Sequence, residues 1–405
     1  MELPVLAGKT IVLGVTGGIA AYKSVELLRI LQKEDARVRV AMTAAAARFV
    51  GPLTFEALTG EAVYSDMWSR ADGDAIRHVT WARECDAIVV APATANTLAR
   101  LAHGLADDAL SALVLAATAP VLLCPAMNVH MYENAATREN LETLARRGYA
   151  VLAPGSGFLA CGDTGAGRLP EPPLIADRLA WLMSPKDLSG KTVLVTAGPT
   201  REFIDPVRFI SNPSSGRMGH AVARAAEHRG ARVILVEGPV SLPDPPGVTV
   251  KRVNSALEMA EAVFASAADA DLVVKTAAVS DYRPESAADQ KIKGSRNQLS
   301  LSLLPNPDIL AELGGRKRAG QLLIGFAAET ENLAAHATEK LAKKNLDMIA
   351  ANLIGAADSG FSAETNKVTL FTRDGSAVQV PLMSKNALAH LILDHAVQLW
   401  GKEKG

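Results

Sequence analysis

Glycines, hydroxyl groups and amides follow apolar runs in the first half of the chain. The turn 15–20 holds Gly17 and Gly18 and opens a helix directly after a buried strand predicted at 10–15. Backbone N–H groups and the helix dipole favour a phosphate at such a helix start. The dinucleotide fingerprint is incomplete, because Ala21 replaces its third glycine and Met42-Thr43 ends the second strand without an acid. The turn disfavours NAD and leaves two interpretations open, a mononucleotide site or a plain structural turn.

Two further polar segments stand where predicted buried strands end. Segment 91–96 offers Thr94 and Asn96 beside small residues that let a flat ring approach the backbone. Thr94 equally suits a helix N-cap. Asn128 either holds a carboxylate through its amide or caps a turn. Because open α/β sheets bind ligands at the carboxyl ends of their strands, both segments are candidate site residues.

The three cysteines differ in their surroundings. Cys85 and Cys124 adjoin or lie in apolar strands and are predicted to be inert packing, whereas Cys161 lies in the glycine-dense loop 160–168, a candidate mobile flap. An odd set of three without a C-x-x-C pair supports neither a disulfide framework nor a zinc site and fits a reducing cytosol. His78 is a candidate acid or base, although a single histidine is more often structural.

The second half carries another set of phosphate-compatible residues. The stretch 211–219 places serines, glycines and Arg217 before a helix. Asp281 follows a strand, where it either binds a metal or a nucleotide hydroxyl or forms a turn. Lys291 and Lys293 alternate in a polar loop, and Lys340 and Lys344 share one helix face. The lysines suit a polyphosphate or a solvated surface equally. Segment 306–310 starts a helix whose N–H groups are free for phosphate.

Alternating strands and helices position these residues. In the first half, strands are expected at 10–15, 37–42, 87–91 and 120–124, with helices between them and Thr43 capping a helix at 44–50. In the second half, strands are expected at 192–196, 232–237, 271–276 and 322–326, helices at 220–229, 255–267, 331–345 and 385–400, and a hairpin at Asp374-Gly375. The fold class is α/β, with two doubly wound (Rossmann-like) parallel-sheet domains.

Length and charge limit the possible functions. A chain of 405 residues suggests two or three domains, and the opening motif of residues 8–13 returns at 190–195, which places a boundary near 185–190. Net charge is −1, so nucleic acid and anionic membranes gain no attraction. Segment 109–129 is uncharged, but Pro120 and Pro125 divide it, so we expect a helix, a buried strand and a loop rather than a membrane span. No signal peptide is apparent.

The first-half motifs together resemble the flavin-dependent cysteine decarboxylases, and most closely phosphopantothenoylcysteine decarboxylase. The matching segments are 16–23, 91–96, 125–128 with Met131, and 160–168, within a fit over roughly residues 8–170. The resemblance implies a flavodoxin-like domain over residues 1–189. It also implies bound FMN, contacted by Gly17, Gly18, Thr43, Pro92, Thr94 and Asn96.

The resemblance also assigns catalytic roles. His78 matches the active-site histidine, Asn128 the residue that holds the substrate carboxylate, and Cys161 the proton donor. A cysteine-derived carboxylate lacks an electron sink, so FMN is expected to oxidise the thiol to a thioaldehyde before CO₂ leaves. The resulting ene-thiol is then reduced and protonated to 4′-phosphopantetheine. Because the family builds its site across a trimer interface, His78 and Asn128 are expected from different subunits.

The second half is similar to phosphopantothenate–cysteine ligase over about residues 190–400. The matching segments are 205–212, 214–216, 277–284 and 325–330, and the order of the two halves matches the bifunctional bacterial coenzyme A biosynthesis family. This resemblance implies activation of 4′-phosphopantothenate by CTP, with Mg²⁺ on the triphosphate, followed by attack of the cysteine amine. Asn212 matches the residue that orients the acyl-cytidylate and Lys291 the lysine that neutralises phosphate charge. The CTP positions are Asp281, Lys291, Pro307, Asp308, Ile309, Leu310, Phe326, Lys340 and Lys344.

Two features qualify the resemblance. Gly294 follows Lys293 where the family often has a further lysine, which lowers the local charge and leaves the division of labour between Lys291 and Lys293 open. A non-catalytic flavin-binding subunit is the alternative function, and such relatives lack the flap cysteine that Cys161 supplies here. The expected assembly is a homo-oligomer with trimeric decarboxylase and dimeric ligase contacts, in the cytoplasm.

Overall fold

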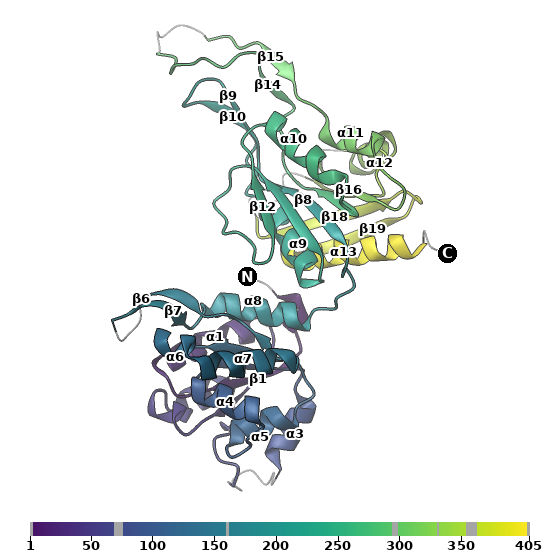
Figure 1. Ribbon diagram of the computed structural model, residues 1–405. Helices are drawn as coiled ribbons and strands as arrows, with labels where there is room; N and C mark the ends of the chain where they lie inside the picture. Colours follow the sequence, from purple (N-terminus) through teal and green to yellow (C-terminus); the bar gives the residue numbers. More distant parts are fainter. Residues whose placement is uncertain are drawn as a thin grey trace. The chain divides into compact units, whose positions relative to one another are not determined.

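The computed structural model describes residues 3–68, 76–158, 162–293, 299–329, 332–353 and 363–402 (Figure 1). The chain forms two compact units, Met1–Ser184 and Pro185–Gly405. No described helix combines the length and apolar character needed to cross a membrane.

The first unit is built on a parallel sheet. Its five strands have the order β2-β1-β3-β4-β5, which is the flavodoxin-like order. Non-alternating apolar runs form these strands because both faces of the sheet are covered. The strands are β1 (Thr10–Val15), β2 (Arg37–Met42), β3 (Ala87–Ala93), β4 (Val121–Pro125) and β5 (Ala150–Val151).

Helices cover the two faces of this sheet. The core on one face takes side chains from α1 (Tyr22–Lys33), α2 (Pro52–Thr59) and α8 (Pro172–Met183). The core on the other face takes them from α3 (Arg77–Glu84), α4 (Ala95–His103), α5 (Ala109–Ala116) and α7 (Ala135–Arg146). The unit also contains α6 (Val129–Glu133), a ribbon of β6 (Gly155–Phe158) and β7 (Thr164–Arg168), and the short 3₁₀ helices η1 (Pro4–Leu6), η2 (Ile19–Ala21) and η3 (Ala46–Arg48).

Local sequence explains where several of these elements begin. Asp108 caps α5 and completes a capping box with Ser111, so the uncharged stretch starts as a helix and continues into β4, as predicted. Thr94 caps α4 by accepting a hydrogen bond from the backbone N–H of Thr97. The helix expected at 44–50 is instead the 3₁₀ helix η3, preceded by a 3.2 Å hydrogen bond from Ala46 N to Thr43 Oγ1.

The second unit contains a larger sheet with the order β12-β11-β8-β13-β16-β17-β18-β19. The first six positions follow the doubly wound 3-2-1-4-5-6 order, and their strands pair in parallel. The strands are β8 (Thr192–Ala197), β11 (Arg232–Glu237), β12 (Thr249–Arg252), β13 (Leu272–Lys275), β16 (Leu322–Glu329), β17 (Met348–Leu353), β18 (Thr365–Thr372) and β19 (Ala377–Ser384).

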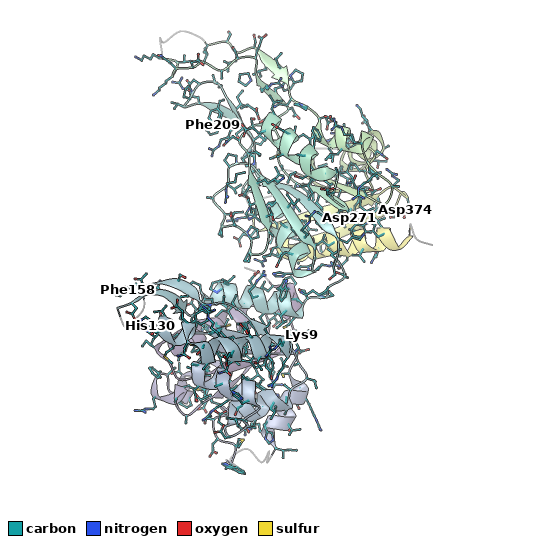
Figure 2. The ribbon with its side chains drawn as sticks, in the orientation of Figure 1. Lys9, His130, Phe158, Phe209, Asp271 and Asp374 are labelled. Carbon is teal, nitrogen blue, oxygen red and sulfur yellow. The ribbon has the colours of Figure 1, made fainter. Side chains whose placement is uncertain are left out.

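The last two strands form the predicted antiparallel hairpin. Asp374, labelled in Figure 2, accepts hydrogen bonds from Thr372 Oγ1 and from the N–H and hydroxyl of Ser376. Gly375 has φ 84°, a left-handed conformation that glycine adopts without strain. These hydrogen bonds and the glycine stabilise the turn that joins β18 and β19 at the edge of the sheet.

Helices again supply two cores. α9 (Arg217–His228) and α13 (Lys385–Lys402) contribute to one, and α10 (Ala256–Ala267), α11 (Ile309–Gly315) and α12 (Leu333–Lys343) to the other. Two small ribbons extend from this unit, β9 (Arg201–Phe203) with β10 (Phe209–Ser211), and β14 (Tyr282–Pro284) with β15 (Leu303–Pro305). Both ribbons lie beyond the helices in Figure 1, in the region of β10 where Figure 2 labels Phe209.

Candidate active sites

A cavity of about 1080 Å³ opens at the carboxyl ends of the strands in the first unit. Its walls come from the segments after β1, β2 and β4 and from the end of β3. The neighbours β1 and β3 form the topological switch point of the sheet, where open α/β folds bind ligands. All six residues predicted to contact a flavin line this one cavity, namely Gly17, Gly18, Thr43, Pro92, Thr94 and Asn96.

Buried hydroxyl groups join the loops that form the cavity. Thr16 Oγ1 donates to Pro92 O at 2.7 Å and accepts from Thr94 N at 3.1 Å. Ser24 Oγ donates to Ala91 O at 2.6 Å. A Cβ placed on Gly17 would stand 2.4 Å from the Cβ of Ala45, so only glycine permits the turn after β1 to approach the turn after β2.

Charged side chains to which the sequence analysis assigned no role complete the walls. Lys23 lines the cavity and pairs with Glu171 at 2.7 Å. Arg100 also lines it and pairs with Asp107 and Asp108. A mixture of small or apolar residues with a few fixed polar groups suits a ligand that combines a flat ring with charged substituents.

Asn128 also lines this cavity and makes two distinct contacts. Its Oδ1 accepts from His130 N at 2.8 Å and caps α6, and its Nδ2 donates to Asp163 Oδ2 at 2.8 Å. Both roles considered from the sequence, capping a turn and holding a carboxylate, are therefore present together. The carboxylate in this structure belongs to the protein itself.

The end of the glycine-dense segment forms β7, which pairs with β6. Phe158 of β6, labelled in Figure 2, lines the cavity. Gly167 accepts from Met127 N at 3.0 Å, and a Cβ on this glycine would stand 2.2 Å from Met127 O. The ribbon thus lies directly on the loop that carries Asn128. Cys161 falls in 159–161, outside the described residues.

The other predicted residues of the first unit lie elsewhere. His78 is half-buried on α3 and is not among the residues that line the cavity within this chain. Cys85 and Cys124 are buried free thiols, and burial raises the pKa of both, which agrees with the expectation of inert packing.

In the second unit, polar residues gather at the switch point between β8 and β13. Thr276 Oγ1 donates to Thr196 O at 2.6 Å, and Thr196 Oγ1 accepts from Ala277 N at 3.1 Å. The side-chain amide of Asn212 donates to Ala278 O at 3.1 Å. These contacts bring Asn212 to the loop that leads to Asp281.

A cluster of charged side chains surrounds the end of β13. Lys344 Nζ pairs with Asp308 Oδ2 at 2.8 Å. Lys275 interacts electrostatically with both of these residues and with Asp281 and Lys340. The structure thus brings together four of the predicted CTP residues and adds Lys275. Sequence reasoning missed Lys275, although a lysine that closes an apolar strand at its carboxyl end is a detectable signal.

The ionisation of this cluster follows from its burial and its neighbours. Burial and the nearby Lys344 lower the pKa of Lys275 to about 8, against the opposing effects of Asp308 and Asp281. Burial alone would raise the pKa of Asp308, but hydrogen bonds from Lys344 and from Ala311 N outweigh it and lower that pKa. The cluster therefore combines the carboxylate of Asp308, whose pKa is lowered, with a lysine whose pKa is about 8.

The remaining predicted CTP residues occupy different environments. Ile309 and Leu310 are 2% and 6% exposed and pack in the core, so their side chains are structural. Phe326 is half-buried against the other core of this unit, the one to which α9 and α13 contribute. Pro307 precedes α11, whose N-cap is Asp308. Lys291 and Lys293 are exposed in a loop held by Asp205 and Arg208, and no contact joins them to the charged cluster among the described residues. Within that same part of the chain, no group of three or more His, Cys, Asp or Glu side chains is placed to hold a metal ion.

Comparisons with known proteins match the two units of the chain to two different families. The family described as "Flavoprotein" matches residues 4–183, and the family described as "DNA/pantothenate metabolism flavoprotein C-terminal domain" matches residues 188–399. Coenzyme A biosynthesis bifunctional protein CoaBC of Vibrio cholerae is 47% identical over 96% of this chain and 98% of its own. Its Bacillus subtilis counterpart is 47% identical over 97% and 98%. The crystal structure of a CoaBC C-terminal domain is 44% identical over 54% of this chain and 99% of its own, with a TM-score of 0.47.

Fold, cavity and family matches define a flavoprotein of pantothenate metabolism with two α/β units. More particularly, the chain belongs to the CoaBC family of bifunctional coenzyme A biosynthesis proteins. It is an enzyme with phosphopantothenoylcysteine decarboxylase and phosphopantothenate–cysteine ligase activities. The alternative of a non-catalytic flavin-binding subunit is not favoured.

Proposed function

We propose that residues 1–189 carry the decarboxylase activity with FMN and residues 190–405 the CTP-dependent ligase activity. The ligase acts first in the reaction sequence, because its product is the carboxylate that the decarboxylase consumes. Both substrates and the nucleotides are small molecules, and we place the reactions in the cytoplasm, where cysteine thiols stay reduced.

One observation carries the FMN assignment, namely that all six predicted contact residues line a single cavity at the β1/β3 switch point. Gly17 and Gly18 precede η2 and α1, which favours the phosphate at that end of the cavity. Pro92, Thr94 and Asn96 border the part lined by small residues, where a flat ring has room. Lys23 stands on the first turn of α1 and adds positive charge beside the glycine turn.

Bound FMN supplies reversible two-electron oxidation of the substrate thiol, so that a thioaldehyde can accept the electrons released with CO₂. Asn128 holds the departing carboxylate through Nδ2, the same donor that binds the Asp163 carboxylate in this structure. Cys161 donates the proton that restores the saturated carbon, and His78 serves as the active-site acid or base.

A homo-oligomer completes this site. Because His78 does not line the cavity that contains Asn128 within one chain, we propose that the histidine of one subunit serves the cavity of another in a trimer. For the ligase unit, we propose a dimer.

In the ligase reaction, the carboxylate of 4′-phosphopantothenate attacks the α-phosphorus of CTP and pyrophosphate leaves. The cysteine amine then attacks the acyl carbon, CMP leaves and the amide forms. Lys340, Lys344 and Lys275 supply positive charge for the triphosphate, with Mg²⁺ bound to the phosphates. Asn212 orients the acyl-cytidylate, and Lys291 neutralises developing charge on phosphate. The nucleotide site is bordered by the start of α11 and by nearby side chains, namely Asp281, Pro307, Asp308, Ile309, Leu310 and Phe326.

A coupled assay tests this assignment. Phosphopantothenate, cysteine, CTP and Mg²⁺ should yield CMP, CO₂ and 4′-phosphopantetheine. Cys161→Ser should stall the second reaction at an oxidised or ene-thiol species while CMP formation continues. Asn212→Asp should impair CMP formation but leave decarboxylation of supplied phosphopantothenoylcysteine intact. A folded, flavin-containing preparation that releases neither CMP nor CO₂ would contradict the proposal.

A further inference from the structure

A buried carboxylate holds the loop that carries the ligase lysine. Asp205 lies between β9 and β10 and is 1% exposed. Its Oδ1 accepts hydrogen bonds from the backbone N–H groups of Val207 and Arg208, each at 2.8 Å. Its Oδ2 accepts from the Arg208 guanidinium, also at 2.8 Å. These bonds fix the shape of the segment before β10.

The same pair reaches a segment more than 80 residues further along the chain. Ile292 N donates to Asp205 Oδ2 at 3.1 Å, and Ile292 O accepts from Arg208 Nη1 at 3.0 Å. A third bond, from Ala288 N to Ile204 O at 2.9 Å, ties the start of the loop to the same segment. Both backbone polar groups of the residue between Lys291 and Lys293 are therefore held.

We propose that Asp205 is a positioning residue of the ligase reaction, which fixes Ile292 so that Lys291 is presented in one direction. The inference rests on the proposed role of Lys291. An exposed lysine on an otherwise unsupported polar loop has many orientations, and transition-state stabilisation requires one of them. A fully buried carboxylate saturated with N–H donors is a stiff support because each lost bond would leave an unpaired polar group.

The first test is Asp205→Asn in the full chain. We expect ligase kcat to fall about 10- to 100-fold, since small displacements of a catalytic group have effects of that size. KM for CTP should change little, because Lys291 acts on charge that develops during the reaction. Decarboxylation of supplied phosphopantothenoylcysteine is the internal control and should be unchanged.

Asp271→Asn is the matched control for general damage. Asp271, labelled in Figure 2, also accepts a backbone N–H, that of Thr192 at 2.9 Å. It precedes β13, at the opposite end of that strand from Lys275. We expect this variant to keep ligase kcat. Equal losses of kcat in the two variants, parallel to their losses of thermal stability, would overturn the proposal.

A mutant cycle separates positioning from folding. Ile292→Pro removes the N–H that Asp205 accepts, and Ile292→Val keeps it. We expect Ile292→Pro to lower ligase kcat as Asp205→Asn does, Ile292→Val to leave it unchanged, and the Asp205→Asn/Ile292→Pro double variant to lose little more than either single variant. Additive losses would show that Asp205 does not act through Ile292.

Lys291→Ala distinguishes failure of this inference from failure of the proposed function. If Lys291→Ala leaves ligase kcat intact, the assigned role of Lys291 is wrong. If Lys291→Ala lowers kcat but Asp205→Asn does not, Lys291 keeps its role and the positioning role of Asp205 is wrong.

Discussion

The side-chain amide of Asn128 donates a 2.8 Å hydrogen bond to the carboxylate of Asp163, 35 residues further along the chain. The donor proposed for the substrate carboxylate therefore already binds a carboxylate on the β6–β7 ribbon. If Asn128 has its proposed role, the substrate carboxylate and Asp163 share or compete for the same side-chain amide, whereas a product without a carboxylate does not.

Asn128→Asp should abolish decarboxylation without unfolding the first unit. Aspartate retains the side-chain oxygen that caps α6 but loses the donor and sets a second carboxylate against Asp163. Asn128→Ala should also be inactive, and it should lower the unfolding free energy by about 1 kcal/mol through loss of the cap. CO₂ release and thermal unfolding measure the two effects, with CMP formation as the internal control. Substantial CO₂ release by Asn128→Asp would exclude the donor role.

Gly17→Ala should lower the FMN content of the purified protein. The added Cβ would meet Ala45 at 2.4 Å, so the turns after β1 and β2 must separate and the cavity must change shape. Gly51→Ala is the matched control in the same unit, because nothing lies within 4 Å of its Cβ position and its φ is −66°. Bound flavin is measured by visible absorbance per chain. Equal flavin content in both variants would contradict a tight turn at Gly17.

CTP binding should weaken as the pH rises through about 8. The pKa of Lys275 is lowered from 10.5 to about 8, so its side chain is charged below that pH and neutral above it. If the triphosphate raises this pKa by one unit, the CTP Kd rises about 10-fold across the transition. Lys275→Gln should flatten this pH profile, measured by calorimetry between pH 7 and 9. Lys191 lies before β8 at the other end of the sheet, so Lys191→Gln should keep the pH dependence of CTP binding. If Lys275→Gln shows the same pH dependence as wild type, Lys275 does not bind the triphosphate.

His390 should make the second unit sensitive to acid. Burial, with His228 and Arg229 nearby, lowers the pKa of His390 to about 4, against the opposing effect of Asp394; Arg224 also lowers it. Between pH 6.5 and 4 the unfolded chain binds a proton that the folded chain does not, so stability falls as the pH decreases. The slope is at most about 1.4 kcal/mol for each pH unit. His390→Leu should reduce this slope in denaturant titrations. Equal slopes for wild type and His390→Leu would contradict this prediction.

Local patterns predicted most of the fold. Uninterrupted apolar runs predicted four strands of each parallel sheet, and Asp374-Gly375 predicted the final hairpin, whereas β5, β12 and β17 were not predicted. The expected helix after Thr43 was shortened to η3, which immediately precedes α2 and its N-terminal Pro52. Motifs at strand ends also predicted the lining of the cavity, because parallel strands bring their carboxyl ends to one edge.

Tertiary pairing explains what the sequence did not predict. The Asn128–Asp163 and Asp205–Ile292 contacts join segments far apart in the chain, and no local periodicity encodes such pairs. The sequence shows Lys275 only as a lysine that ends a strand, because its neighbours Asp308 and Lys344 belong to distant segments of the chain. His78 does not line the cavity within this chain, so its role in the site stays a prediction.

The junction between the two units determines how the protein can be divided. Ser184 donates its hydroxyl to Ala180 O at the end of α8, and Leu188 is fully buried in the second unit. Asp187 and Asp394 pair with the guanidinium of Arg229, whose side chain is only 4% exposed. A ligase fragment that begins at Lys191 would leave Arg229 without its Asp187 partner, whereas one that begins at Pro185 retains it. A cut between Ser184 and Pro185 therefore keeps both Asp187 and Leu188 with the second unit.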